Sequence, residues 1–525
     1  MAARVMFLGL DGGTMAAFTP LFERGVMPNL AAFWRKSATG TLRSSDPMVT
    51  PVAWTSFSTG CTPAVHGIHE FAYLDPKSRE IHANHAGRVR VATLWHVLHA
   101  EDREVALLNL PMTYPPPQVA GLVVGGSDAP TLDWAFAKCP KFGAALLARY
   151  PHYTHKIVWK GRPKSIDDLK ARAKWNCEIF GAQADAALMA DARTDWTAMM
   201  VHFHNLDSLQ HRLWPEMNVD ATGVVREGWN IEVERCLHSL DQAIGVLLEL
   251  ADRRDAAVIA VSDHGFGPCR AVVDMNKILR REGFQCEPTF RAKIQRRASR
   301  AGDRLRRWVA RRSPGGEGRR TSKSVEAQVG CDWSRTRVFA PLGQLSGCLY
   351  VNPSFRLSSS SRERLIEEVI GSCRAQVDPQ TGDRLFRDVF SLADRYGVDP
   401  DDHGAPDILA LSADGYQAQA KWSQNDHSWI RPDPNLPATH HREGVVAIDA
   451  PGIRTGHSLS ADIHDLAPTV LALLGLGIPD WMEGRVLNEA FDEPLDTFPS
   501  RLSVTGNDPT LDTELVAAGF GAATD

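Results

Sequence analysis

Short apolar runs alternate with longer helical patterns along most of this chain, and this alternation constrains the fold more than any other feature. The runs are bounded by polar or glycine positions and cover residues 5–10, 198–203, 256–261 and 445–448. Parallel strands that are buried on both faces give such runs, and the segments between them supply crossover helices. We therefore predict a three-layer α/β fold, in which helices cover both faces of a mostly parallel central sheet.

Three of these runs lead into a carboxylate. Asp11 follows the first run, Asp207 comes just past the second and Asp263 follows the third. In open α/β sheets, ligands bind outside the carboxyl ends of the strands. The three acids are therefore expected to converge on one crevice.

The composition is that of an ordinary globular protein. The chain has 525 residues, 43% hydrophobic content and a net charge of −5, which gives no global case for a nucleic-acid partner. Its nine cysteines include no Cys-x-x-Cys spacing, which argues against a disulfide framework or a thiolate zinc site and favours the cytoplasm. We find neither a signal peptide nor an apolar stretch of the roughly 18 residues that a membrane span needs.

The alternation breaks between residues 284 and 332. Residues 291–323 hold thirteen Lys or Arg against two acids. We predict a catalytic domain over residues 1–487, a basic helical insertion within it at 288–330, and a C-terminal tail over 488–525. A solvated arginine-rich helix is one interpretation of the insertion. The other is a basic amphipathic helix at 290–312 that lies on an anionic membrane surface, which would make a cytoplasmic protein peripheral to the membrane.

Two acid–histidine pairs have spacings that suit a metal ion. Asp207 and His211 are four residues apart, so they lie on one face of a helical turn. Asp263 and His264 are adjacent and precede a Gly-Phe-Gly-Pro turn at the sheet rim. Taken singly, the first pair also fits a helix start with a surface histidine, and the second fits a polar strand end.

Thr50 begins a short predicted helix. It stands at the N-cap position, Pro51 follows at the first helical position and Gly60 lies past the end. One interpretation is that Thr50 only caps this helix. The other is nucleophilic: the N–H groups and positive dipole end of a helix N-terminus favour a phosphoryl group on that hydroxyl, whose ionisation a metal ion would promote.

Several segments, taken in order, resemble the alkaline phosphatase superfamily, and within it the type I phosphodiesterase/nucleotide pyrophosphatase-like branch of phosphohydrolases and phosphomutases. They are Gly9-Leu-Asp11-Gly, Thr50-Pro-Val-Ala-Trp-Thr-Ser-Phe-Ser-Thr-Gly60, His66-Gly-Ile68, Asn109-Leu-Pro-Met-Thr-Tyr114, Asp207-Ser-Leu-Gln-His211, Ser262-Asp-His-Gly-Phe-Gly267, Gly456-His457, and Asp465-Leu-Ala-Pro-Thr469 through Gly484-Arg485. The resemblance implies an alkaline-phosphatase-like three-layer fold.

The resemblance also implies a site with two divalent metal ions. One ion is held by Asp11, Thr50, Asp263 and His264, and the other by Asp207, His211 and His457. Donors of nitrogen and oxygen without cysteine suit zinc, and manganese is the alternative. His440, His441 and His464 lie near His457 in sequence and are alternatives to it.

The implied reaction is hydrolysis of a small phosphorylated substrate, a phosphodiester or a phosphomonoester, through a phosphothreonine at Thr50. The sequence His69-Glu70-Phe71 departs from the asparagine of nucleotide pyrophosphatases, which counts against nucleotide-type specificity. The segment from Thr50 to Trp54 lacks the Cys/Ser-x-Pro-x-Arg motif of sulfatases. Trp54 is a candidate wall of the substrate pocket, although a buried core tryptophan is the favoured interpretation.

Two other functions are kept as alternatives. A phosphomutase would return the phosphoryl group to the substrate instead of passing it to water. A non-catalytic, metal-stabilised scaffold would bind membranes or protein partners through the basic helix. The complete set of ligand types and Thr50 argue against the scaffold, because a degenerate site is expected to lose some of them.

Overall fold

A computed structural model describes residues 2–75, 78–217, 228–287, 329–341, 347–398, 404–420 and 428–500. The chain divides into two compact units. The described residues of 1–68, 85–270 and 433–509 form unit 1, and those of 69–84 and 271–432 form unit 2. Most of the predicted insertion at 288–330, including the proposed membrane contact at 290–312, lies outside the described residues, as does most of the tail over 488–525. The predicted domain boundaries therefore stay a prediction.

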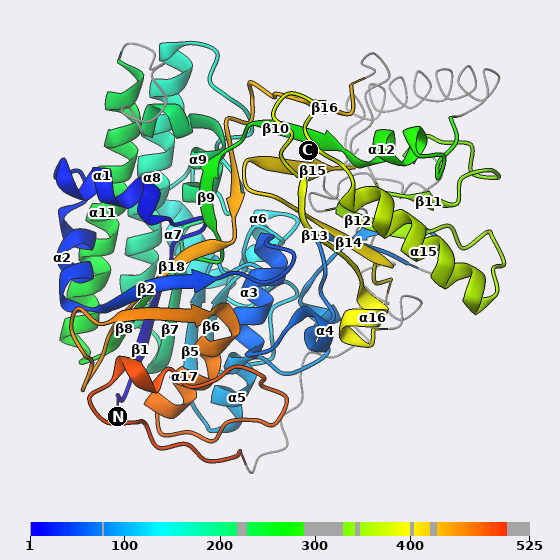
Figure 1. The fold of residues 1–525 in the computed structure, drawn as a ribbon. Helices are drawn as coiled ribbons and strands as arrows, with labels where there is room; N and C mark the ends of the chain where they lie inside the picture. The colour runs from blue at the N-terminus through cyan, green and yellow to red at the C-terminus, as the bar shows by residue number, and fades with distance from the viewer. Residues whose placement is uncertain are drawn as a thin grey trace, which may run out of the picture. The chain divides into compact units, whose positions relative to one another are not determined.

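Unit 1 is built on an eight-stranded sheet with the strand order β19-β2-β18-β8-β1-β7-β5-β6 (Figure 1). The five strands β8, β1, β7, β5 and β6 are parallel, as predicted. The run at 445–448 also forms a strand, β18, but β18 is antiparallel to both of its neighbours. The strands are β1 (Val5–Gly9), β2 (Ala38–Arg43), β5 (Glu104–Leu108), β6 (Gly121–Val124), β7 (Trp196–His202), β8 (Ala257–Val261), β18 (Glu443–Asp449) and β19 (Ser458–Asp462).

Helices cover both faces of this sheet, which confirms the predicted α/β three-layer fold. Alternate residues of β1 point to opposite faces: Met6 and Leu8 join one hydrophobic cluster, and Val5 and Phe7 join another. The first cluster is completed by α1 (Met15–Glu23), α2 (Pro28–Lys36), α7 (Pro140–Arg149), α8 (Ile166–Asp191), α9 (Asn205–Met217) and α11 (Trp229–Arg253). The second is completed by α3 (Thr50–Thr59), α5 (Leu94–Ala100) and α17 (Leu466–Leu473).

Shorter elements complete unit 1. The strands β9 (Gly265–Pro268) and β17 (Ala438–His441) pair antiparallel beside the large sheet. The remaining helical segments among the described residues of unit 1 are α4 (Pro63–His66), η1 (Ala86–Arg88), α6 (Leu132–Ala135), η2 (Ile463–Asp465) and η3 (Asn488–Ala490). Among the helices that the structure describes, none is long and apolar enough to cross a membrane.

Unit 2 has its own sheets and its own hydrophobic core. A four-stranded sheet has the order β11-β12-β14-β13 and a three-stranded sheet the order β15-β10-β16. Its elements are β3 (Ala72–Leu74), β4 (Ile81–Ala83), β10 (Ala271–Asp274), α12 (Met275–Arg281), β11 (Val338–Phe339), β12 (Gly347–Val351), α15 (Ser359–Arg374), β13 (Phe386–Ser391), α16 (Leu392–Tyr396), β14 (Ile408–Ser412), β15 (Tyr416–Gln419) and β16 (Ile430–Arg431).

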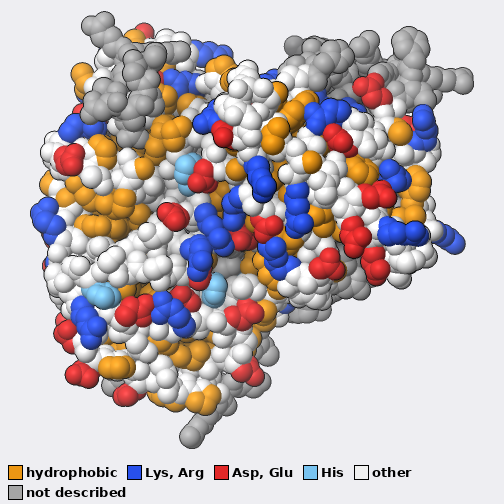
Figure 2. Space-filling view, in the orientation of Figure 1, with side chains coloured by type: hydrophobic (Ala, Val, Ile, Leu, Met, Phe, Trp, Pro, Cys, Tyr) orange, Lys and Arg blue, Asp and Glu red, His pale blue; other side chains and the backbone are white. Residues whose placement is uncertain are grey.

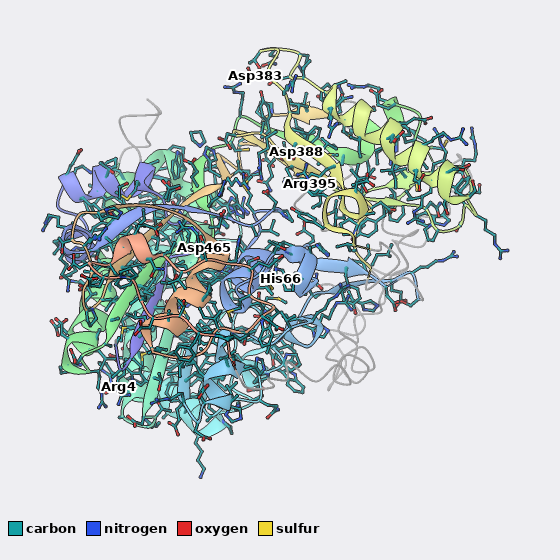
Figure 3. The ribbon with its side chains drawn as sticks, turned by 60° about the horizontal axis from the view of Figure 1, so that its bottom comes forward. Arg4, His66, Asp383, Asp388, Arg395 and Asp465 are labelled. Atoms are coloured by element: carbon teal, nitrogen blue, oxygen red, sulfur yellow. The ribbon has the colours of Figure 1, made fainter. Side chains whose placement is uncertain are left out.

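Acidic and basic side chains are intermixed over the face that Figure 2 shows. Within unit 2, for example, Arg395 and Asp388 form an ion pair with 2.6 Å between Nη1 and Oδ2 (Figure 3). Such mixing agrees with the small net charge of −5.

Candidate metal centre

The acids that were predicted from the sequence as candidate ligands lie at the carboxyl edge of the large sheet. Asp11 lies two residues after β1 ends, and Asp263 lies two residues after β8 ends. Asp207 stands in the first turn of α9, which follows β7. These three strands are parallel neighbours, so their carboxyl ends meet at one rim. The structure therefore brings Asp11, Asp207 and Asp263 together.

One group of candidate ligands consists of Asp11, Asp263 and His264, none of which is exposed to solvent. The Nε2 atom of His264 is 3.8 Å from Oδ1 of Asp11 and 3.3 Å from Oδ2 of Asp263. The backbone amide of Gly12 donates to Oδ1 of Asp263 at 3.1 Å, so one carboxylate oxygen is anchored and the other faces His264. This arrangement suits a single cation that shares the three side chains.

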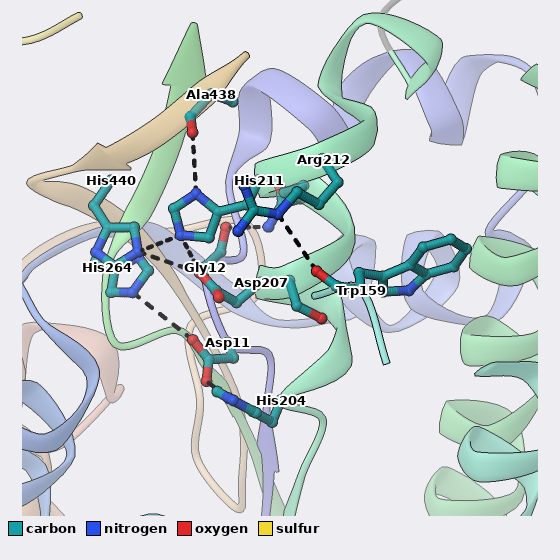
Figure 4. Close-up of polar contacts among 12 residues, drawn as sticks. Asp11, Gly12, Trp159, His204, Asp207, His211, Arg212, His264, Ala438 and His440 are labelled. Carbon is teal, nitrogen blue, oxygen red and sulfur yellow. Dashed lines mark hydrogen bonds and ion pairs between the residues drawn. The ribbon is translucent and has the colours of Figure 1, made fainter. Parts of the chain in front are cut away.

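A second group consists of Asp207, His211 and His440 (Figure 4). Oδ1 of Asp207 is 3.5 Å from Nε2 of His211 and 3.3 Å from Nε2 of His440. The two Nε2 atoms are 3.0 Å apart. The rings of His440 and His264 stack with 3.6 Å between their centroids, so the two groups are adjacent.

Backbone carbonyls fix the orientation of all three imidazoles. The Nδ1 atoms of His211, His264 and His440 donate to the carbonyl oxygens of Ala438, Gly265 and Met48 at 3.0, 3.1 and 2.9 Å. With Nδ1 engaged by a carbonyl oxygen, each Nε2 faces one of the acids. Metal-bound histidines in proteins show this pattern, in which the second ring nitrogen donates to a carbonyl or a carboxylate.

The electrostatics of the cluster also fit a cation. Burial lowers the pKa of His211 to about 4 and that of His264 to about 3, so both imidazoles are neutral, the form that binds metals. Burial would raise the pKa of Asp207, but His211 and His440 outweigh it and hold the pKa at about 2. Burial and then the charge of Asp11 raise the pKa of Asp263 well above its ordinary value.

Several buried ligand atoms of the cluster lack a hydrogen bond to any residue that the structure describes. They are Oδ1 of Asp11, Oδ1 of Asp207, Oδ2 of Asp263 and Nε2 of His264. An unsatisfied buried carboxylate oxygen is destabilising unless a cation neutralises it. The donor set of carboxylates and imidazoles, without cysteine, suits zinc and manganese. The residues that are present therefore fit divalent metal ions.

Two further histidines contact Asp11, and sequence reasoning missed both. Nδ1 of His204 lies 2.7 Å and Nε2 of His202 lies 3.1 Å from Oδ2 of Asp11. Burial would raise the pKa of Asp11, but hydrogen bonds from these histidines hold it well below its ordinary value. The sequence contained a usable pattern: His202 and His204 are two residues apart at the end of a strand, and residues at this spacing face the same side.

Thr50 is the first residue of α3 and is buried, with Val49 rather than Thr50 at the N-cap. The helix ends at Thr59, and Gly60 follows it with a left-handed φ of 68°, as the sequence predicted for a glycine past the end. Met48, two residues before Thr50, accepts the hydrogen bond from His440. This bond ties the start of α3 to the second group of ligands.

Trp54 is a core residue. Only 1% of it is exposed, and its ring packs edge-on against Phe57 and His202 with centroids 5.4 and 4.8 Å away. A ring buried in this way has no face left for a leaving group. The substrate-wall prediction therefore does not fit the structure, whereas the core interpretation does.

The structure does not bring His457 to the cluster. His457 immediately precedes β19, and its carbonyl accepts from the amide of Thr39 at the start of β2. Both β2 and β19 run in the same direction as β8, so their amino ends lie at the edge opposite to Asp263. The histidine that stands beside Asp207 is His440 instead.

The direction of β18 explains why His440 takes this place. Because β18 is antiparallel to β8, the chain enters β18 at the carboxyl rim of the sheet, and residues just before the strand lie there. His440 belongs to β17, which ends two residues before β18 begins. An apolar run such as 445–448 gives no information on strand direction, so the sequence could not select this histidine.

Two of the matching sequence segments have structural roles (Figure 3). Nε2 of His66 lies 3.0 Å from the hydroxyl of Ser56 within the core of unit 1. The carboxylate of Asp465 accepts from the backbone amides of Asp462 and Arg485, both at 2.9 Å. These side chains hold loops in place.

The family model described as type I phosphodiesterase / nucleotide pyrophosphatase matches residues 5–442. The chain belongs to this family. Membership confirms the predicted resemblance and the predicted enzyme class, a hydrolase acting on phosphoric ester bonds. A search of curated proteins gave no match to the sequence.

Solved structures with this family's fold cover nearly the whole chain. Alkaline phosphatase PafA is 13% identical, with a TM-score of 0.58 over 93% of this chain and 99% of PafA. Phosphonoacetate hydrolase from Sinorhizobium meliloti 1021, solved with phosphonoacetate, is 16% identical, with a TM-score of 0.51 over 89% and 94% of the two chains. Human ectonucleotide pyrophosphatase / phosphodiesterase 5 is 11% identical, with a TM-score of 0.50 over 94% and 100%. These likenesses confirm the alkaline-phosphatase-like fold.

Proposed function

We propose that this protein is a metal-dependent phosphoester hydrolase that uses two divalent metal ions, zinc or manganese. Asp11, Asp263 and His264, together with Thr50, would hold one ion. Asp207, His211 and His440 would hold the other, with His440 in the place first assigned to His457. The observation that carries this proposal is the set of buried carboxylate oxygens and imidazole Nε2 atoms that face one another within 3.8 Å, several of them without a hydrogen bond to any described residue.

Thr50 is the proposed nucleophile. Its hydroxyl attacks phosphorus in line with the leaving oxygen, and a phosphothreonine forms. The bound ions supply Lewis-acid chemistry, which favours ionisation of the threonine and neutralises charge on the phosphoryl oxygens. The start of α3 helps to bind the phosphoryl group, because the positive end of the helix dipole at Thr50 favours an anion there. Water then hydrolyses the phosphothreonine.

The substrate is expected to be a small phosphorylated molecule. Phosphonoacetate hydrolase, which shares the fold, is solved with phosphonoacetate. For the present chain, phosphodiesters and phosphomonoesters are both compatible with the cluster, and rates on bis-p-nitrophenyl phosphate and p-nitrophenyl phosphate decide between them. A phosphomutase would release no inorganic phosphate from its own substrate.

The compartment is proposed from the cysteines. None of the nine cysteines, all of which the structure describes, forms a disulfide. A reducing compartment such as the cytoplasm agrees with this arrangement.

The deciding experiment compares metal-reconstituted wild type with Thr50→Ala. We expect Thr50→Ala to lose at least about 1000-fold in kcat/KM, because single nucleophile substitutions in hydrolases have effects of this order or larger. Acid-quenched wild type should yield a phosphorylated peptide that contains Thr50. Thr455→Ala is the matched control, since Thr455 is exposed and donates to Lys36 at the opposite edge of the sheet. Equal activity of wild type and Thr50→Ala would exclude Thr50 as the nucleophile.

A further inference from the structure

Two cysteines face each other where α8 packs against α11. Sγ of Cys177, on α8, is 3.8 Å from the carbonyl oxygen of Arg235, the neighbour of Cys236. In the reciprocal contact, Sγ of Cys236, on α11, is 3.7 Å from the carbonyl oxygen of Ala173, one turn before Cys177. Each thiol therefore lies against the backbone of the other helix, beside the other cysteine.

The helix packing supports a close approach at this point. Ala173 is fully buried and presents only a methyl group between the helices, which lets the backbones come near each other. The hydroxyl of Ser239, one turn after Cys236, donates to the carbonyl oxygen of Cys177 at 3.4 Å. Contacts from residues 173 to 177 on one helix and from 235 to 239 on the other fix the two cysteines opposite each other.

The two thiols have unequal chemistry. A hydrogen bond with Cys236 lowers the pKa of Cys177 to about 7, and the hydroxyl of Ser239 and the charge of Arg235 act in the same direction. That same hydrogen bond and then burial raise the pKa of Cys236 well above its ordinary value. Cys177 is partly exposed, whereas Cys236 is buried. A partly exposed, low-pKa thiol with a second thiol beside it is the arrangement of redox-sensitive cysteines.

We propose that Cys177 and Cys236 form an oxidisable dithiol, which a peroxide converts into a disulfide between α8 and α11. The Cys177 thiolate attacks one peroxide oxygen and breaks the O–O bond, giving the sulfenic acid and hydroxide, which the proton lost by the Cys177 thiol converts to one water. The Cys236 thiol then attacks the Cys177 sulfur and displaces the second water as the S–S bond forms. Two thiols lose two electrons and two protons, and one hydrogen peroxide becomes two waters.

Two buried cysteines of the chain, Cys61 and Cys373, lack these properties. Burial raises the pKa of Cys61 and of Cys373 to about 12, so each stays a thiol at neutral pH. Peroxide at low concentration should therefore leave both unmodified. The disulfide would join the helices that precede β7 and β8, the strands that lead to Asp207 and Asp263.

The experiment treats the reduced, metal-loaded full chain with a small molar excess of hydrogen peroxide. We expect the loss of two titratable thiols, a tryptic peptide pair linked through Cys177 and Cys236 under non-reducing conditions, and a melting temperature raised by several degrees that dithiothreitol reverses. Cys236→Ser should instead trap a dimedone adduct on Cys177.

Cys373→Ser is the matched control and should form the same linked peptide at the same rate as wild type. The proposal is overturned if wild type keeps its thiols, if Cys177 oxidises without linking to Cys236, or if it links only between two molecules. The peptide map of wild type decides among these results even where a serine variant folds poorly. None of the readouts depends on the proposed hydrolase activity.

Discussion

Replacing His440 by asparagine tests the revised ligand set directly. The substitution removes an imidazole nitrogen that lies 3.3 Å from Asp207 and 3.0 Å from His211. A catalytic metal ion contributes several kcal/mol to transition-state stabilisation. If about 3–4 kcal/mol is lost with the ion, kcat/KM falls by about 100- to 1000-fold, because each ~1.4 kcal/mol is a factor of ten.

His457→Asn is the matched control for this substitution. His457 is partly exposed at the opposite edge of the sheet, and substitutions at such positions usually change stability by less than about 0.5 kcal/mol. We expect its kcat/KM to stay within about twofold of wild type, a factor that corresponds to such an energy. The assay measures hydrolysis of both p-nitrophenyl substrates, with the metal content determined by mass spectrometry on the same samples. A large loss in His457→Asn together with an unchanged His440→Asn would refute the reasoning.

The remaining predictions concern the stability of each unit. Burial raises the pKa of Asp274 to about 6, so this carboxyl favours folding below its unfolded pKa of 3.8, and that contribution is lost as the pH rises through 6. Asp274→Asn keeps a side-chain acceptor at the N-cap of α12. At pH 8 this variant should be more stable than wild type by at most about 3 kcal/mol, whereas at pH 4 it should have no such advantage. Urea unfolding at the two pH values measures the difference. In Gly265→Ala the added Cβ would lie 1.9 Å from the carbonyl oxygen of Glu443, so a loss of about 1–3 kcal/mol or more is expected. Gly371→Ala, where a Cβ meets open space within a helix, should instead be neutral or slightly stabilising, and an equal effect of the two substitutions would contradict this account.

The sequence was sufficient to predict the site residues that come directly after the carboxyl end of a predicted strand. The runs at 5–10, 198–203 and 256–261 became β1, β7 and β8, and Asp11, Asp207 and Asp263 follow them to one rim. These predictions worked because parallel strands share a carboxyl edge, whatever the crossovers between them. The helix that begins at Thr50 was also predicted, to within one residue at its start.

The rest of the site depends on information that local sequence does not contain. His440 lies at the rim because β18 enters the sheet in the opposite direction, and strand direction is a property of the tertiary fold. His202 and His204 share one side of a strand end, but whether that side faces Asp11 depends on how β7 pairs with β1. Trp54 is buried by packing against His202, which the spacing from Thr50 does not show.

The reversed course of β18 also has a consequence for how the protein is made. During translation, His440 is added long after Asp11, Asp207 and Asp263. The nascent chain therefore contains several acids of the site before it contains the imidazole that completes the second group. Since like charges close together oppose compaction, tight binding of the proposed second ion must await the C-terminal third of the polypeptide, whereas the proposed ligands of the first ion all precede residue 265. Truncated translation products that end before residue 438 would then lack the imidazole that completes the second group and would bind the proposed second ion poorly.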